Sequence, residues 1–165
     1  MSDFEKTAVP YDATTRKVNG QTPEFASPLR RRKNGAVLKG LVVSSDDEVR
    51  RKLAEILGQC GLVAEFASTV TESAVVLTAH EVIVVLCQDS LADGTYEDIV
   101  EMADALGAKV PIIVVSRTGD WPEYFTAIGD GAFDYLAYPP IASDLPRIVR
   151  NVLLEYKRRR HLEGA

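Results

Sequence analysis

The sequence predicts an α/β fold in which a five-stranded parallel sheet is covered by helices on both faces. Short apolar segments alternate with helical segments from residue 36 onward, and this alternation is typical of β/α units. Residues 82–87 and 110–116 are apolar almost throughout, as expected for strands that are buried on both faces. The chain has 165 residues, of which 46% are hydrophobic, and this is enough for one domain.

The first two β/α units follow directly from residue 36. The apolar run at residues 37–43 predicts the first strand. Residues 46–59 predict the first helix, because their apolar side chains recur every three or four positions. Residues 62–67 predict a short second strand, and residues 70–79 a second helix that begins after Thr69, a good capping residue.

Three further units complete the pattern. The remaining predicted strands are residues 82–87, 110–116 and 133–138, and the remaining predicted helices are residues 96–106, 121–128 and 144–160. Right-handed crossovers between parallel strands turn such units into a doubly wound three-layer sandwich. Five units fit the flavodoxin-like (βα)5 fold with strand order 2-1-3-4-5.

In such a sheet, function collects at the carboxyl ends of the strands. The residues expected at those ends are Ser44–Ser45, Ala67–Ser68, Cys87–Gln88–Asp89, Ser116–Arg117 and Tyr138–Pro139. They are mostly neutral, and no glycine-rich phosphate loop follows the first strand. This argues against binding of a nucleotide or a flavin.

The charge is distributed unevenly along the chain. Residues 1–35 carry seven Lys and Arg against four Asp and Glu, and their proline-rich, aperiodic composition predicts a disordered tail with a basic end. Residues 36–156 form the predicted domain and carry 19 Asp and Glu against eight Lys and Arg. Residues 157–165 are again basic and extend the last helix. We therefore expect only weak binding of nucleic acid, through the two ends.

The composition also bears on compartment and metal binding. No apolar run is long enough to span a bilayer, and the first residues do not resemble a secretory signal. The two cysteines, Cys60 and Cys87, have neither a disulfide framework nor a zinc-type spacing. We therefore expect a cytoplasmic protein without a membrane partner, a metal or a cofactor.

Several motifs together resemble the receiver domain of response regulators. The first is Leu41-Val42-Val43 followed by a polar pair and Arg50-x-x-Leu53-x-x-x-Leu57. The others are Leu91-Ala92-Asp93-Gly94, Pro111-Ile112-Ile113-Val114-Val115-Ser116 and Gly131-Ala132-Phe133-Asp134-Tyr135-Leu136-Ala137-Tyr138-Pro139. The resemblance covers residues 38 to about 156.

The resemblance implies a two-component phosphorelay chemistry, and this chain replaces most of the residues on which that chemistry depends. In the family, an acidic pair after the first strand binds Mg²⁺ with an Asp that ends the third strand and accepts a phosphoryl group from a histidine kinase. A Thr or Ser ending the fourth strand and a Lys before the fifth-strand proline contact the phosphoryl oxygens. The positions that match hold Ser44 and Ser45 for the pair, Ser116 for the hydroxyl and Tyr138 for the lysine.

The position that matches the phospho-acceptor holds Cys87 when counted from the strand. Counting back from Asp93-Gly94 gives Leu86 instead, and neither count gives an aspartate. Asp89 lies two residues beyond the strand, where a turn residue is expected. The resemblance thus identifies a degenerate pseudo-receiver that is not an enzyme.

Two alternatives stay open. An unusual phosphorelay receiver would use Asp46, Asp47 and Asp89 with Mg²⁺, although Ser45 and Glu48 have capping-box spacing that places both aspartates in the first helical turn. A thiol-based sensor would use Cys87, and its reactivity would need a nearby cation, for which Arg117 is the candidate.

The leading interpretation is a bacterial signalling module that works by phosphorylation-independent protein–protein contact. Gln88, Asp46 and Arg117 would line the vacated pocket, and Ser116 and Tyr135 match the family's switch pair. Arg117 would either lie in solvent as a loop residue, or fold over the pocket and pair with Asp89 or with an anionic group of a ligand. The resemblance places the signalling face on the fourth helix, fifth strand and fifth helix. Trp121, Tyr124 and Tyr138 would form the interface there. We expect the partner to be a histidine kinase, another signalling protein or a second copy of this chain.

Overall fold

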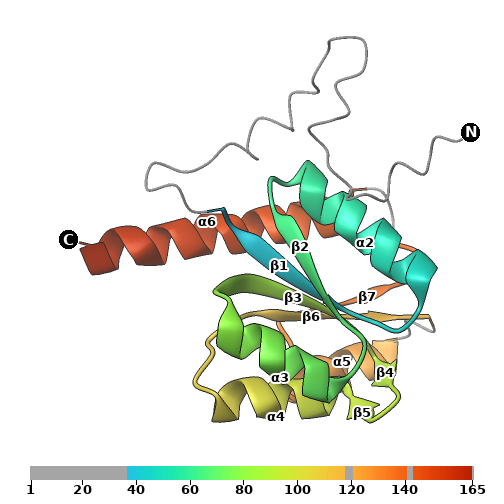
Figure 1. The fold of residues 1–165 in the computed structure, drawn as a ribbon. Helices are drawn as coiled ribbons and strands as arrows, with labels where there is room; N and C mark the ends of the chain where they lie inside the picture. The colour runs from blue at the N-terminus through green and yellow to red at the C-terminus, as the bar shows by residue number, and fades with distance from the viewer. Residues whose placement is uncertain (1–36, 118–120, 141–142, 165) are drawn as a thin grey trace, which may run out of the picture.

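A computed structural model describes residues 37–117, 121–140 and 143–164, with the backbone alone at Trp121, Glu163 and Gly164 (Figure 1). A five-stranded parallel sheet runs through its centre. Its strands are β1 (Lys39–Val43), β2 (Val63–Ala67), β3 (Val82–Gln88), β6 (Ile112–Ser116) and β7 (Asp134–Ala137). The order β2-β1-β3-β6-β7 confirms the predicted order 2-1-3-4-5. The predicted N-terminal tail, residues 1–35, lies outside the described residues.

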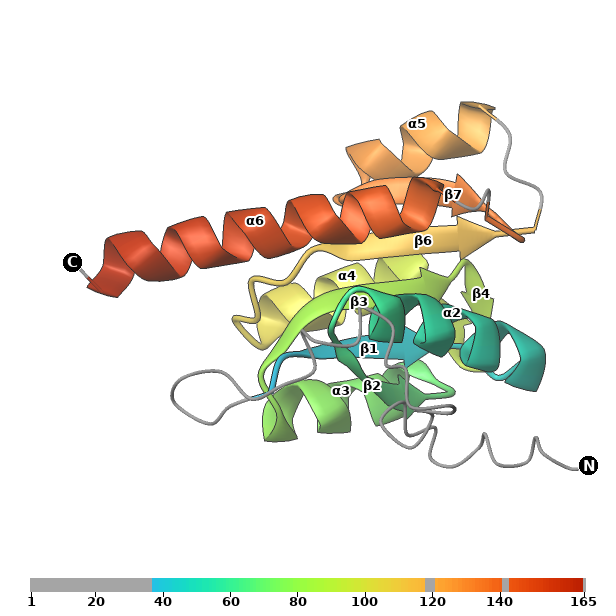
Figure 2. The ribbon, with the colours of Figure 1, turned by 90° about the horizontal axis from the view of Figure 1, so that it is seen from above.

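Helices cover both faces of the sheet and make three layers (Figures 1 and 2). On one face lie α2 (Asp47–Gln59) and α6 (Asp144–Gly164). On the other lie α3 (Val70–Ala79), α4 (Tyr96–Ala105) and α5 (Trp121–Gly129). The end of α6 projects past the sheet, so the basic residues 157–160 continue the helix as predicted.

The core is divided by the sheet. Alternate strand residues point to opposite faces, so Val42, Val84 and Leu86 pack under α2 and α6. Leu41 and Val43 pack with Val85 and Cys87 under α3 and α4. The central strands β1, β3 and β6 are therefore buried on both faces, as their continuous apolar runs predict.

The first helix begins one residue later than the sequence predicts. Asp46, not Ser45, is the N-cap of α2, and its carboxylate accepts hydrogen bonds from the N–H groups of Glu48 and Val49 at 2.9 and 3.2 Å. The N–H of Asp46 itself donates to the hydroxyl of Ser44. Because the Ser44 hydroxyl anchors the chain before the helix, Ser45 is left exposed.

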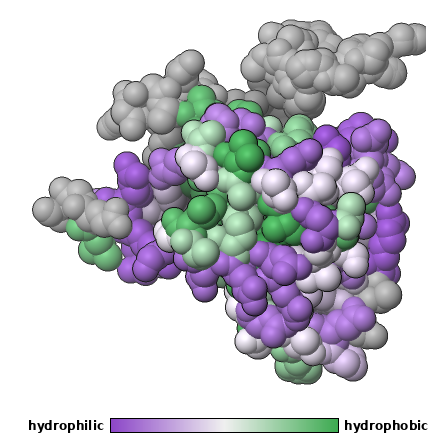
Figure 3. All heavy atoms as spheres, turned by 60° about the horizontal axis from the view of Figure 1, so that its bottom comes forward, coloured by the Kyte–Doolittle hydropathy of each residue, from purple (hydrophilic) through white to green (hydrophobic). Residues whose placement is uncertain are grey.

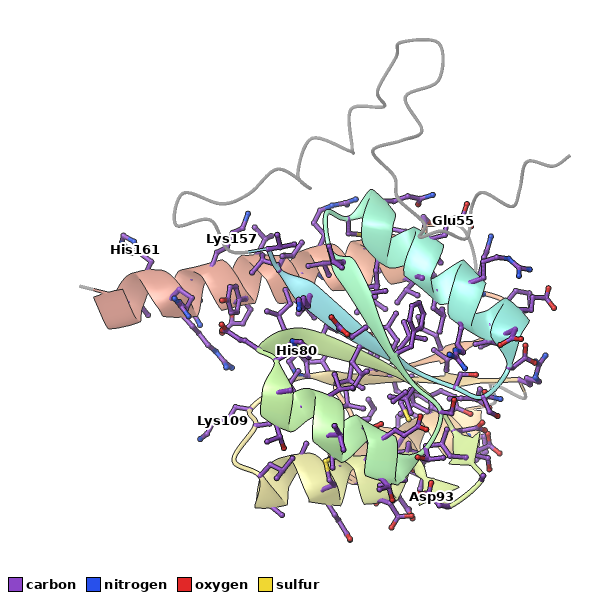
Figure 4. All side chains as sticks on the ribbon, in the orientation of Figure 1. Glu55, His80, Asp93, Lys109, Lys157 and His161 are labelled. Atoms are coloured by element: carbon purple, nitrogen blue, oxygen red, sulfur yellow. The ribbon has the colours of Figure 1, made fainter. Side chains whose placement is uncertain are left out.

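A small hairpin between β3 and α4 was not predicted. It consists of β4 (Ser90–Leu91) and β5 (Gly94–Thr95), which pair antiparallel. Asp93 at its turn caps α3, because its carboxylate accepts hydrogen bonds from the N–H groups of Val70 and Thr71 at 2.8 and 3.2 Å. Figure 4 shows Asp93 beside the start of that helix. The hairpin therefore links the end of β3 to α3.

The surface is mainly hydrophilic, with some exposed apolar side chains. Figure 3 shows hydrophobic patches among hydrophilic residues on the side that carries α3 and α4. The large exposed hydrophobic residues include Val75 on α3, Phe125 on α5 and Leu154 on α6. Among the described residues, no helix is both long and apolar enough to cross a membrane.

Candidate functional site

Polar side chains from four segments meet at the carboxyl end of the sheet. Ser44 follows β1, Gln88 ends β3, Arg117 follows β6 and Tyr138 follows β7. Asp46, the N-cap of α2, joins them. We call these five residues the crest cluster. They include the predicted pocket residues Asp46, Gln88 and Arg117, which the structure brings together.

The centre of the crest cluster is a neutral hydrogen bond. The hydroxyl of Ser44 donates to the side-chain carbonyl of Gln88 at 2.6 Å, and it accepts the N–H of Asp46 at 3.0 Å. Ser44 is fully buried, so both functions of its hydroxyl are satisfied inside the protein. The two positions joined here follow the paired residues Val43 and Cys87 of neighbouring strands, which explains their proximity.

An ion pair lies beside this hydrogen bond. The guanidinium of Arg117 donates to the carboxylate of Asp46 at 2.8 Å, and its carbon lies 5.4 Å from the centre of the Tyr138 ring. The N–H groups of Val49 and Glu48, together with Arg117, hold the pKa of Asp46 below its usual value. Arg117 thus pairs with Asp46 and not with Asp89, and its side chain stays 56% exposed.

The phenol of Tyr138 is held in this arrangement as a neutral group. Partial burial is the main reason that its pKa is raised, and the nearby carboxylates of Glu48 and Asp46 add to the effect. Tyr138 precedes Pro139 through a cis peptide bond. A neutral ring beneath a guanidinium is a stable cation–π contact, but it offers no charge to a phosphoryl group.

Cys87 does not point into the crest cluster. It is fully buried among the side chains under α3 and α4, as is Leu86 on the opposite face of the sheet. Burial raises the pKa of the Cys87 thiol far above its ordinary value, and the charge of Asp89 raises it further. The side chain that reaches Ser44 belongs to the next residue, Gln88. Counting residues could not show this, because the pleat decides which of two neighbours faces the site.

The other acidic residues at the carboxyl end of the sheet, Asp47 and Asp89, do not come together at one site. The carboxylate of Asp47 is 94% exposed and lies 4.0 Å from Arg50. Asp89 is half-buried in the backbone turn after β3, where its N–H donates to Val115 and its carbonyl accepts from Tyr96. Among the described residues, no group of three or more His, Cys, Asp or Glu could hold a metal ion. The Asp46 carboxylate already binds Arg117.

The pair that matches the family's switch residues is buried. Ser116 is the last residue of β6, and Tyr135 lies in β7 with its ring turned inward. The hydroxyl of Tyr135 donates to the carboxylate of Glu123 on α5. Tyr124 packs edge-on against Tyr135, with ring centres 6.2 Å apart. These contacts tie α5 to the edge strand of the sheet.

The predicted interface residues differ in exposure. The side chain of Trp121 lies outside the described residues. Tyr124 is half-buried against Tyr135, and Tyr138 is half-buried under Arg117. Among the described side chains of α5, the exposed aromatic is Phe125, a residue that is 66% exposed. Phe125 was not singled out from the sequence as an interface residue, because a helical pattern alone did not show which aromatic faces outward.

Comparisons with known proteins agree with this architecture. No family model matches the chain. Over 105 residues it is 30% identical to the photosynthetic apparatus regulatory protein RegA of Rhodovulum sulfidophilum, a match covering 64% of this chain and 57% of RegA. Over 115 residues it is 26% identical to the response regulator protein PilR of Pseudomonas aeruginosa, covering 70% of this chain and 26% of PilR. The chain thus spans about half of RegA and a quarter of PilR.

Solved structures show the fold more directly. The signal receiver domain of a Vibrio parahaemolyticus protein superposes with a TM-score of 0.72 at 17% identity, over 79% of this chain and all of that domain. The beryllofluoride-activated NtrC4 receiver domain dimer gives 0.65 at 20% identity, over 72% of this chain and 98% of that one. The fold of this protein is therefore the receiver-domain fold of response regulators.

Proposed function

We propose that this protein is a receiver-like signalling module that acts by protein–protein contact and does not accept a phosphoryl group. The observation that carries the proposal is the Arg117–Asp46 ion pair of 2.8 Å beside the Ser44–Gln88 hydrogen bond. In this proposal Gln88, not Cys87, takes the place of the phospho-acceptor. The protein would be cytoplasmic and would catalyse no reaction itself.

The chemistry of the crest cluster supports this reading. Phosphoryl transfer to a protein side chain needs a nucleophilic carboxylate and cations that neutralise the transferred oxygens. The Gln88 amide oxygen is a poor nucleophile, and Ser44 supplies only a hydroxyl. The one cation, Arg117, already neutralises Asp46. The cluster therefore holds together without a metal or a phosphoryl group.

The acidic alternative is less well supported by the geometry. It would require Asp46, Asp47 and Asp89 to share Mg²⁺. Asp46 is the N-cap of α2 and also binds Arg117, whereas Asp47 points into solvent. Binding of Mg²⁺ by Asp46 would therefore break both the N-cap of α2 and the ion pair with Arg117. The thiol alternative fares no better, because a sensor thiol needs access and a lowered pKa, and Cys87 has a raised pKa and is buried.

The proposed partners are a histidine kinase, another signalling protein or a second copy of this chain. The proposed contact surface, here called the signalling face, is made by α5, β7 and α6. It offers Phe125 and Ile128 on α5, and Phe133 directly before β7, as exposed apolar side chains. Large apolar side chains of this kind are common anchors in protein interfaces.

A labelling experiment tests the proposal. The protein is incubated with radiolabelled acetyl phosphate and Mg²⁺, and we expect no acid-labile label on it. A restored variant that combines Ser44→Asp, Ser45→Asp, Gln88→Asp, Arg117→Ala and Tyr138→Lys should become labelled. In a matched control, Cys87→Asp replaces Gln88→Asp in the same background, and it should stay unlabelled because that side chain faces the core.

The outcome that contradicts the proposal is equally specific. Label on the unmodified protein that disappears in Asp89→Asn would establish the acidic alternative. Amide NMR shifts on adding Mg²⁺ and beryllofluoride provide a second readout that does not depend on the stability of a phosphoryl bond. We expect no saturable shifts at residues 44–47, 86–89 and 116.

A further inference from the structure

The two helical layers carry opposite charge. The helices α2 and α6 contain nine Arg and Lys against six Asp and Glu. The helices α3, α4 and α5, on the other side of the sheet, contain six Asp and Glu and no Arg or Lys. A net acidic chain therefore presents one basic side, which a total charge of −5 does not reveal.

Several cations on the basic side are not neutralised by neighbours. Arg51, Lys52, Arg150 and Lys157 are exposed and form no ion pair with any described residue. The other basic residues of α6 are paired, as in the bonds of Arg158 and Arg159 to Glu155. We call the outer surface with the four unpaired cations the basic face.

The four cations lie on two neighbouring helices. The helices α2 and α6 pack side by side over one core. Arg150 of α6 is close enough to Cys60, at the end of α2, to oppose the rise in thiol pKa that burial causes. Arg51 of α2 is close enough to Tyr138 to oppose the rise in its pKa. Figure 4 shows Lys157 on the outer side of α6, and Lys109 on the opposite side of the molecule.

The composition of the basic face favours a phosphate backbone over a protein surface. Its large exposed hydrophobic side chains are Leu154 and Leu162, and no aromatic side chain among the described residues of α2 and α6 is exposed. Protein interfaces are rich in aromatic anchors and poor in lysine, whereas protein–nucleic acid interfaces are polar and strongly positive. The acidic helices on the opposite side of the sheet would repel the same polyanion.

We infer that the basic face binds the sugar-phosphate backbone of a nucleic acid without reading its bases. Arg51 and Lys52 contact phosphates from α2, and Arg150 and Lys157 contact them from α6. This inference places the contact on two packed helices, with Arg51, Lys52 and Arg150 inside residues 36–156, whereas the sequence suggested only the chain ends, to which Lys157 belongs. It does not depend on the proposed signalling function.

Fluorescence anisotropy with a labelled duplex DNA and the full-length protein tests the inference. With about four phosphates neutralised, the logarithm of the binding constant should fall with the logarithm of salt concentration with a slope of about −3.5. The quadruple variant Arg51→Gln, Lys52→Gln, Arg150→Gln, Lys157→Gln should lose at least about tenfold in affinity at low salt and most of the slope. Changing the duplex sequence should have no effect.

A matched control separates the basic face from net charge. The variant Lys109→Glu, Thr78→Glu, Thr126→Glu makes the net charge more negative by four, as the quadruple variant does, but at positions outside α2 and α6, and it should bind like the unmodified protein. A third variant replaces Arg30, Arg31, Arg32 and Lys33 with Gln and measures the contribution of the N-terminal basic run. Circular dichroism confirms that each variant is folded.

Three results would overturn the inference. They are no binding of duplex by the unmodified protein at low salt, equal loss in the quadruple variant and its matched control, and binding that depends only on residues 30–33. An acidic protein partner is distinguished by a polyglutamate peptide as competitor. If that peptide displaces the duplex at lower charge concentration than unlabelled DNA does, the face is built for acidic protein and not for nucleic acid.

Discussion

At the scale of single residues, two carboxylates stabilise the starts of two different helices. Asp46 caps α2 and binds Arg117, and Asp93 caps α3 from a hairpin 23 residues away in sequence. Each accepts two backbone N–H groups at a helix start, where the positive end of the helix dipole also favours a negative charge. Each therefore stabilises the fold only while it is ionised.

The cap at Asp93 has a pH-dependent signature. Hydrogen bonds from the Val70 and Thr71 N–H groups lower the pKa of Asp93. The contribution of Asp93 to the free energy of unfolding is therefore fully present above the unfolded-state pKa of about 4, and it is lost as the pH falls through the lowered folded-state pKa. We expect Asp93→Asn to lower the melting temperature at pH 7, and the difference from the unmodified protein to shrink toward pH 2.

Thermal unfolding followed by circular dichroism across this pH range checks the prediction. Asp104→Asn serves as the control, because the Asp104 carboxylate makes no hydrogen bond to any described residue. A difference between Asp93→Asn and the unmodified protein that stays constant with pH would show that the cap does not depend on charge.

At the scale of elements, the turn between α5 and β7 depends on one glycine. Gly131 has a φ of +109°, and a Cβ there would lie 3.1 Å from the Val100 side chain on α4. The same turn brings the Phe133 N–H to the carbonyl of Ile112 and so starts the pairing of β7 with β6. A side chain at Gly131 would strain the backbone and press on α4 at once.

Two alanine substitutions in this segment should therefore differ in sign. Gly131→Ala should lower the free energy of unfolding by about 1–3 kcal/mol, because L residues avoid its backbone conformation. Gly129→Ala, in the last position of α5 with open space around it, should raise it by about 0.5 kcal/mol through helix propensity. Chemical denaturation measures both, and equal effects would contradict the role given to the turn.

At the scale of the whole molecule, the two outward surfaces offer different chemistry. The signalling face presents exposed apolar side chains beside the edge strand β7, whereas the basic face presents cations. Contacts at these surfaces should differ in their response to salt, because screening weakens charge pairs and leaves apolar burial intact. One molecule can therefore hold two kinds of partner without competition for the same residues.

Self-association through the signalling face has a well-matched control. Phe125 on α5 and Val75 on α3 are 66% and 64% exposed, so a lysine at either position disturbs the fold little. We expect sedimentation velocity to show a concentration-dependent dimer that Phe125→Lys abolishes and Val75→Lys leaves intact. A dimer lost equally in both variants, or only in Val75→Lys, would move the contact to another surface.

How much of this follows from sequence depends on how local each feature is. Strand order and helix positions follow from periodicity and from chirality rules that act on neighbouring segments. The face to which a residue at the end of β3 points depends on the pleat, so counting residues along the sequence could not show that Gln88, and not Cys87, faces Ser44. The Asp93 cap joins residues in different elements, and no local pattern could reveal it.

The ion pair at the crest has a consequence for time. A phosphoryl group on a protein side chain has a limited lifetime, because it is lost by hydrolysis. The module then returns to its unphosphorylated state. The bond between Arg117 and Asp46 is encoded in the chain and does not decay. Under the proposed function, the duration of a signal would therefore be set by how much of this protein is present and how long its partner stays bound.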